Sequence, residues 1–233
     1  PRGGSKGQQT VFELQEIQSF ENLAKSMSFS ASGRFGSGIY SGSASFGYFE
    51  SSDYTAYSTY LLVHVKAINS DMTLKSHKLT PEGQAFLSQG QDAFFNGCGD
   101  SFVSQRTEGG EFYAVVEFRS RSEEHKKDVQ AKVRASGGTW SFGSEFKQKM
   151  EQMAQIAETN VRMIRIGGSG NLPDFGDPQS AQYDTLTGYA LKFPDIVSAE
   201  SGKAWVISFT VEDYGVVSEV SVPSPSLIAQ KDA

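Results

Sequence analysis

The residues of this chain that could carry out chemistry have a spacing that matches no known catalytic or metal-binding pattern. Cys98, the single cysteine, could act as a nucleophile, but no base can be assigned to it, and a lone buried cysteine is more often structural. His64 alternates with apolar residues and is expected to be an ordinary strand residue, while His77 and His125 lie in polar surroundings without ligand spacing. We therefore expect no metal ion and no cofactor.

Enzyme motifs are missing as well. The chain contains no nucleophile elbow, P-loop, HExxH or CxxC sequence. Gly167-Gly168 follow an apolar stretch, but no GK[ST] comes after them, so they predict a turn and not a phosphate site. ADP-ribosylating toxins combine an Arg, a Ser-Thr-Ser-like strand and a Glu-x-Glu pair; Ser58-Thr59, Glu108 and Glu111 fit that order and spacing poorly. We expect that the protein is not an enzyme.

Length and charge narrow the remaining classes. The 233 residues suffice for one large domain or two small ones, and a chain of this size buries a core without staples. A net charge of −6 argues against binding to nucleic acid. No apolar run reaches the roughly 18 residues of a transmembrane helix. Residues 1–10 are rich in Gly, Gln and Ser and predict a flexible arm, and residues 223–233 predict an extended tail.

The stretch 98–122 predicts one long β-strand that contains a glycine pair. Every second residue from Phe112 to Phe118 lies on one face, and every second residue from Tyr113 to Arg119 lies on the other. Gly109-Gly110 interrupt this pattern and indicate a bend, a bulge or a close backbone approach. If the pair is a hinge, bulky substitution there should leave folding of the monomer largely intact.

Two segments are compatible with more than one structure. Residues 28–54 alternate Ser, Gly and Ala with aromatic residues, which a flexible linker rarely contains. Residues 119–158 contain a good helix start at Ser122, yet residues 129–135 alternate strictly as in a strand, and Gly137-Gly138 predict a turn. A stripe of large apolar residues at helical spacing predicts a core-facing helix, and its members are Trp140, Phe142, Phe146, Met150 and Met153.

The remaining elements are simpler. Residues 11–27 predict a short strand followed by a helix, and residues 55–69 and 159–166 predict strands. Thr80-Pro81 predict the start of a helix that runs to about Asn96, with Phe86, Leu87, Phe94 and Phe95 facing inward. Residues 171–188 predict a loop, and 189–197 and 204–211 predict strand or helix-edge elements.

Taken in chain order, these elements resemble the membrane attack complex/perforin and cholesterol-dependent cytolysin superfamily, the MACPF-type domain. The resemblance covers about residues 25–170. Cys98 to Phe102 take the place of the family's Tyr-Gly-Thr-His-Phe motif, with Gly99, Asp100, Ser101 and Phe102 in the last four positions. Gly109-Gly110 match the glycines at the sheet bend, and Gly167-Gly168 match the turn after the last core strand. Cys98 and Ser101 replace the Tyr and His of the motif.

The resemblance implies an α+β fold: a bent, twisted four-stranded antiparallel sheet flanked by two helical clusters, in a single domain over residues 11–222. It implies a secreted, soluble monomer that forms a ring-shaped homo-oligomer on a target membrane, with membrane lipid and an unidentified receptor as partners. Residues 28–54 and 119–158 would become transmembrane β-hairpins of a large barrel. Their expected lipid-facing residues are Phe29, Phe35, Ile39, Phe46, Val129, Ala131, Val133 and Ala135.

A second interpretation stays open. The negative charge, the short inserting segments and the altered motif suit a MACPF-like module that binds or scaffolds without making pores.

Overall fold

The structure is a computed structural model that describes residues 7–17, 57–135, 144–169 and 181–218, together with positions 22, 172 and 220. The chain forms two compact units, residues 1–70 with 108–207 and residues 71–107 with 208–233. The predicted membrane-inserting residues Phe29, Phe35, Ile39 and Phe46 lie outside the described residues. The domain boundaries expected from the sequence stay predictions.

In its described part, the first unit contains four antiparallel strands in the order β1-β2-β4-β5. They are β1 (Gln9–Ile17), β2 (Ser58–Ile68), the part of β4 (Ser101–Arg119) from residue 108 onward, and β5 (Glu158–Ile166). The strands predicted at 55–69 and 159–166 are thus confirmed. β4 is a single strand of 19 residues that continues through both glycines.

Among the residues that the structure describes, the sheet has six strands, so the predicted number of four was too small. The two further strands, β3 (Met72–Thr73) and β6 (Trp205–Asp213), both pair with β4. Met72 and Thr73 lie opposite Arg106 and Gln105 of β4. A strand of two residues has no readable period, and the 204–211 pattern did not identify its neighbour, because strand pairing is not local in sequence.

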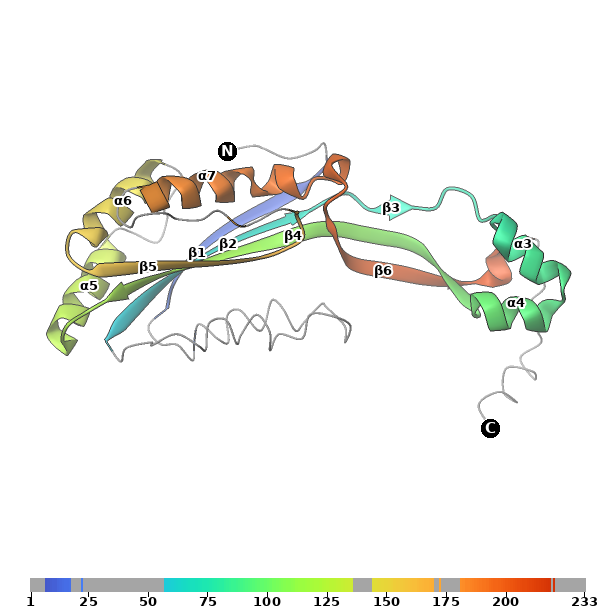
Figure 1. The fold of residues 1–233 in the computed structure, drawn as a ribbon, viewed down its shortest axis with the longest axis horizontal. Helices are drawn as coiled ribbons and strands as arrows, with labels where there is room; N and C mark the ends of the chain where they lie inside the picture. Colours follow the sequence, from blue (N-terminus) through green and yellow to red (C-terminus); the bar gives the residue numbers. More distant parts are fainter. Residues whose placement is uncertain are drawn as a thin grey trace. The chain divides into compact units, whose positions relative to one another are not determined.

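Three helices cover one face of the first unit's sheet: α5 (Glu123–Ala135), α6 (Ser144–Ala154) and α7 (Ala181–Ile196). Figure 1 shows them beside the strands. We call this the Phe112 face, and its buried strand residues are Leu61, Val63, Val65, Ala67, Phe112, Ala114, Val116 and Phe118. The opposite, Tyr113 face buries a smaller cluster of Ile17, Tyr60, Leu62, Tyr113 and Val115.

Helix α7 corrects residues 181–188 of the loop predicted at 171–188 and the mixed element predicted at 189–197; residues 173–180 lie outside the described part. Its buried residues are spaced by three or four positions, as in one helical face, and they are Tyr183, Leu186, Ala190 and Phe193, followed by Val197. Gly188 and Pro194 lower helix propensity, which hid this period in the sequence. The core role predicted for Phe146, Met150 and Met153 of α6 is confirmed.

The second unit contains α3 (Pro81–Ser88) and α4 (Gln91–Cys98), where the sequence predicted one helix. Gly90 separates them, because its φ of 116° is not helical. The predicted cap is present: the Gly83 amide donates to Thr80 Oγ1 at 3.2 Å. Phe94 is buried, whereas Phe86, predicted to face inward, is 40% exposed.

Short 3-10 turns over Ala199–Ser201 and Tyr214–Val216 complete the described elements. None of the helices in the described ranges is both long enough and apolar enough to cross a bilayer.

The core of the first unit makes a direct stability prediction. Phe112 is fully buried against Tyr189 and Phe193, with ring centroids 5.2 and 5.8 Å away. We expect Phe112→Ala to lower the free energy of unfolding by about 3–5 kcal/mol, because it removes apolar burial and leaves a cavity. Val103→Ala, at a 46% exposed position, is the control and should change it by about 0.5 kcal/mol or less. Urea unfolding measures both, and equal effects would contradict this description of the core.

Candidate functional site

The glycine pair of β4 is a place of close backbone approach. A Cβ atom at Gly109 would overlap the carbonyl oxygen of Ala67, on the neighbouring strand β2. A Cβ atom at Gly110 would lie 2.6 Å from the carbonyl oxygen of Ile166 and 2.7 Å from Val197 Cγ1. Neither glycine has a positive φ, so it is space and not backbone conformation that requires glycine here.

The predicted turn at Gly167-Gly168 packs against this pair. Both turn residues are left-handed, with φ of 80° and 78°. A Cβ at Gly167 would lie 2.9 Å from the Gly109 carbonyl oxygen, so three glycines bring β4 and the end of β5 together. The Gly168 amide donates to the Lys203 carbonyl at 2.7 Å and fixes the turn. The sequence predicted both glycine pairs but not that they meet.

Asn69, which the sequence analysis did not single out, fastens α7 to the strands beside the glycines. Its side-chain amide donates to the Val197 carbonyl at 2.8 Å, and its backbone amide donates to the Glu108 carbonyl at 2.8 Å. Gln8 donates to the Asn69 side chain at 2.8 Å and to the Pro194 carbonyl at 2.9 Å. The residue is only 4% exposed, and a buried asparagine whose amide both donates and accepts within the protein helps to fix a unique arrangement.

A buried carboxylate, Glu111, follows the glycine pair directly. It is 1% exposed on the Tyr113 face, and three donors surround it. Lys66 Nζ lies 3.2 Å from Oε1, His64 Nε2 lies 3.3 Å from Oε2, and the Tyr113 hydroxyl donates to Oε2. Burial disfavours the charged carboxylate, but the hydrogen bonds from His64 and Tyr113 and the charges of Lys66 and His64 outweigh it and lower its pKa to about 2.

His64 extends this charged cluster to a third strand. Its Nδ1 lies 3.2 Å from Glu13 Oε2 on β1, and its ring stacks on Tyr113 of β4 with centroids 4.4 Å apart and planes 2° from parallel. The register explains the contact, because Glu13, His64 and Tyr113 are directly opposite one another across β1, β2 and β4. We call Glu13, His64, Lys66, Glu111 and Tyr113 the charged cluster.

A second buried carboxylate, Glu117, lies on the same face. It accepts hydrogen bonds from Ser58 Oγ at 2.7 Å and from Arg119 Nε at 3.2 Å. Ser58 lies opposite Arg119, and Lys66 lies opposite Glu111, eight residues further along β2. At about 3.4 Å per residue, the structure therefore does not bring Ser58 and Glu111 together as an ADP-ribosylating site would need.

The motif positions lie around the end of α4 and the start of β4. Gly99 ends α4 with a φ of 80°, and the Asp100 carbonyl accepts from the Tyr214 amide at 3.3 Å. Ser101 Oγ donates to Asp100 Oδ1 at 3.1 Å. Phe102 packs in tilted geometry on Tyr214, with centroids 5.3 Å apart. These contacts are structural, and they hold the second unit's helix pair to its strands.

Residues 119–158, whose sequence is compatible with both helix and strand, form a helix pair in this structure. Val129 and Val133 of α5 are buried in the core of the Phe112 face, whereas Ala131 is exposed. Ala135 ends α5, and its side chain is outside the described part. The strand-like alternation of these four residues therefore does not form a strand in this structure.

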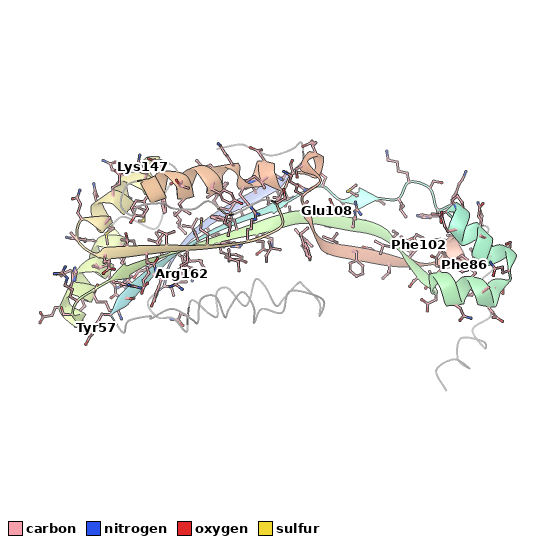
Figure 2. The ribbon with its side chains drawn as sticks, in the orientation of Figure 1. Tyr57, Phe86, Phe102, Glu108, Lys147 and Arg162 are labelled. Atoms are coloured by element: carbon pink, nitrogen blue, oxygen red, sulfur yellow. The ribbon has the colours of Figure 1, made fainter. Side chains whose placement is uncertain are left out.

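Polar contacts fasten this helix pair to its surroundings. Arg134 Nε on α5 donates to both oxygens of Glu16 on β1 at 3.2 Å. Lys147 of α6, labelled in Figure 2, donates to Asp184 Oδ2 of α7 at 2.6 Å. The His125 Nε2 atom lies 2.8 Å from the Ile156 carbonyl oxygen and links the two ends of the segment. The first two pairs are at the surface and are individually weak.

The buried carboxylate leads to a prediction about acid stability. Its pKa is lowered from 4.5 to about 2, so its contribution to stability is complete above pH 4.5 and is lost as the pH falls towards 2. We expect Glu111→Gln to lower the free energy of unfolding by on the order of 3 kcal/mol at pH 7. The difference from the unmodified protein should shrink steadily in urea titrations at pH 4, 3 and 2. A difference that does not change with pH would contradict this assignment.

The close approach at the glycine pair revises the expectation that substitution leaves folding intact. We expect Gly110→Ala to destabilise the monomer by about 1–3 kcal/mol, because the added methyl group would press on a carbonyl oxygen and on Val197. Gly188→Ala in α7 is the matched control, since nothing lies within 4 Å of its Cβ. That change should stabilise the helix by up to about 1 kcal/mol. Thermal unfolding compares the two, and a neutral Gly110→Ala would mean that the strands separate easily here.

No protein-family model and no curated protein sequence matches the chain. Among solved structures, 27 chains match. Pneumolysin is 16% identical with a TM-score of 0.39, over 89% of this chain and 40% of that chain. GNIP1Aa from Chromobacterium piscinae is 13% identical with a TM-score of 0.34, over 97% and 46%. Astrotactin-2, described as a perforin-like membrane protein, is 11% identical with a TM-score of 0.33, over 72% and 60%. The chain thus spans less than half of the first two and 60% of the third.

Proposed function

We propose that this chain is a MACPF-type pore-forming protein. It would assemble into a ring on a target membrane, where residues 119–158 change from helices α5 and α6 into a transmembrane β-hairpin. Residues 28–54 would supply the second hairpin. The proposed partners are membrane lipid, further copies of the chain and a receptor on the target. The protein would start as a secreted, soluble monomer, and the proposal includes no enzymatic step.

The register of β4 and β5 carries the proposal. The helix pair joins two strands that are already antiparallel neighbours, and their last paired residues are Arg119 and Glu158. If the same pairing continues through the segment, Gly137 comes to lie opposite Trp140, and Gly138-Thr139 form a two-residue turn. Glycine in a two-residue turn is a strong hairpin signal. The glycines therefore occur where an unbroken extension of β4 and β5 needs its turn.

The extended register also separates apolar from charged residues. Within residues 129–148 of the hairpin, one face would carry only two polar residues, Ser144 and Gln148; Lys127, opposite Met150, would begin the polar end of that face. Its apolar residues would be Val129, Ala131, Val133, Ala135, Trp140, Phe142, Phe146 and Met150. The arms, residues 120–137 and 140–157, have about 18 residues each, more than the 9–11 that a tilted strand needs to cross a bilayer.

On the opposite face of the hairpin, charges of opposite sign would be paired across the strands. The same register places Lys126 opposite Glu151, Asp128 opposite Lys149, and Lys132 opposite Glu145. Cross-strand pairs of opposite charge stabilise an antiparallel ladder, whereas like charges in the same places would oppose it. A water-filled lumen would accommodate this face, and lipid would accommodate the apolar one.

The outer edges of the first unit's sheet suit assembly. Within the described residues, β1 and β5 are at the two ends of the four-strand order, and neither has a strand partner on its outer side. β1 and β5 run in opposite directions, because each neighbouring pair between them is antiparallel. The β5 edge of one copy could therefore pair with the β1 edge of the next in the same alternating pattern. Only a closed ring of such copies would satisfy every strand edge in lipid.

Cysteine pairs test the proposed hairpin. Asp128→Cys with Lys149→Cys, in a Cys98→Ser background, would place two sulfur atoms at directly opposite positions in the membrane-assembled state. We expect a disulfide to form there when a mild thiol oxidant is added, because directly opposite Cα atoms are about 4.5–5.5 Å apart. The matched control, Asp128→Cys with Glu151→Cys, is displaced by two residues, and its diagonal distance of about 7–8 Å should reduce cross-linking several-fold.

The same samples are measured for dye release from liposomes and for rings by electron microscopy. Rings, release and preferential cross-linking of the opposite pair together support the proposal. Equal cross-linking of both pairs would contradict the register. If no rings and no release occur with any lipid mixture, the pore-forming function is wrong, and the non-lytic binding or scaffolding module is favoured.

A further inference from the structure

The His64 ring lies between two carboxylates that belong to different strands. Its Nδ1 faces Glu13 Oε2 of β1 at 3.2 Å, and its Nε2 faces Glu111 Oε2 of β4 at 3.3 Å. An ionised carboxylate only accepts hydrogen bonds, and a neutral imidazole has only one N–H to donate. Only the doubly protonated ring therefore satisfies both contacts at once.

The two carboxylates differ in what happens to them when the ring loses a proton. Glu111 is buried, with a side chain 2% exposed, and water cannot replace a donor that it loses. The Glu13 side chain is 63% exposed and can turn to water. The single remaining N–H would therefore stay on Nε2 and donate to Glu111, while the Nδ1 lone pair would face Glu13 and repel it.

The other groups that face His64 favour the same outcome. On β4, Tyr113 stacks on the ring at 4.4 Å and donates its hydroxyl to Glu111. On β2, Lys66 lies 3.2 Å from Glu111 Oε1 and holds that carboxylate in its charged form. On β1, the charged group is Glu13 itself. The β4 side of the cluster thus keeps its donors after the proton is lost, and the contact to β1 is the one that breaks.

We propose that His64 is a proton-dependent clamp that fastens the edge strand β1 to the centre of the sheet. In its protonated form the ring ties β1 to β4 across β2. Loss of the proton releases the Glu13 side chain, while β1 keeps its backbone ladder to β2, the apolar packing of Phe12, Leu14 and Ile17, and the contact between Glu16 and Arg134.

The clamp would regulate the strand that another copy could pair with. An acidic medium would hold β1 tightly in place, and a more alkaline one would loosen this edge. That consequence rests on the proposed function, whereas the clamp itself belongs to the free monomer and can be measured without any membrane.

Hydrogen–deuterium exchange of the full chain, without lipid, tests the clamp. Protection of the β1 amides, corrected for intrinsic exchange, is followed from pH about 5.5 to 8.5. We expect about a tenfold fall in protection across this range, the size expected for loss of one charge-assisted hydrogen bond. Protection of the α3 amides, in the second unit, should change much less.

Three variants decide the cause. The fall should disappear in His64→Gln, which cannot titrate, and in Glu13→Gln, which can both donate to and accept from the ring. It should persist in Glu16→Gln, the matched control, because Glu16 is on the same strand and contacts Arg134 on the Phe112 face. If His64→Gln does not fold, Glu13→Gln and Glu16→Gln still decide, since both change residues outside the buried core.

Constant β1 protection in the unmodified protein, or an undiminished fall in Glu13→Gln, would overturn the clamp. Neither result depends on whether the protein makes pores. Conversely, absence of dye release from liposomes would end the pore-forming proposal and leave the clamp standing.

Discussion

Strand β4 is hydrogen-bonded on both sides and buried on both faces along the first unit, and the rest of that unit depends on this constraint. Such a strand cannot shift by one residue without exchanging its two faces. Phe112, Val116 and Phe118 would then enter the charged cluster, and Glu111 would enter the core below the helices. Buried carboxylates thus act together with the apolar alternation to define one register.

The charged cluster helps to specify this register, but burying it is unfavourable for the stability of the fold. Burying a carboxylate is unfavourable, and a buried ion pair often contributes less to stability than an apolar replacement would. Glu111 is nevertheless surrounded by three donors, so its position on β4 is specified relative to Lys66 and His64 on β2. The glycine pair next to it acts in a different way: it lets the carbonyl groups of Ala67 and Ile166 approach β4 more closely than any side chain would allow.

Much of this could be predicted from the sequence, for reasons that are local. Strand alternation identified β2, β5 and both faces of β4, and Thr80 identified the start of α3. The break at Gly90 and the helix α7 were missed, because one glycine changed the backbone direction and because Gly188 and Pro194 hid a helical period. His64 was assigned to a strand correctly, but its carboxylate partners come from β1 and β4, and sequence pattern alone does not show which strands become neighbours.

The two structures proposed for residues 119–158 can share one sequence because a spacing of four residues suits both periods. Val129 and Val133 are one helical turn apart, and they are also on one side of a strand, since four is an even number. Phe146 and Met150 have the same spacing and are buried in the helix pair. Ala131 completes the strand face but is exposed in the helix, and a small side chain makes that exposure cost little. Met153 is buried in the helix pair yet would lie on the charged side of the hairpin, so it stabilises only the helical form. Residues of this last kind set the balance between the two states, because they contribute burial energy to one of them alone.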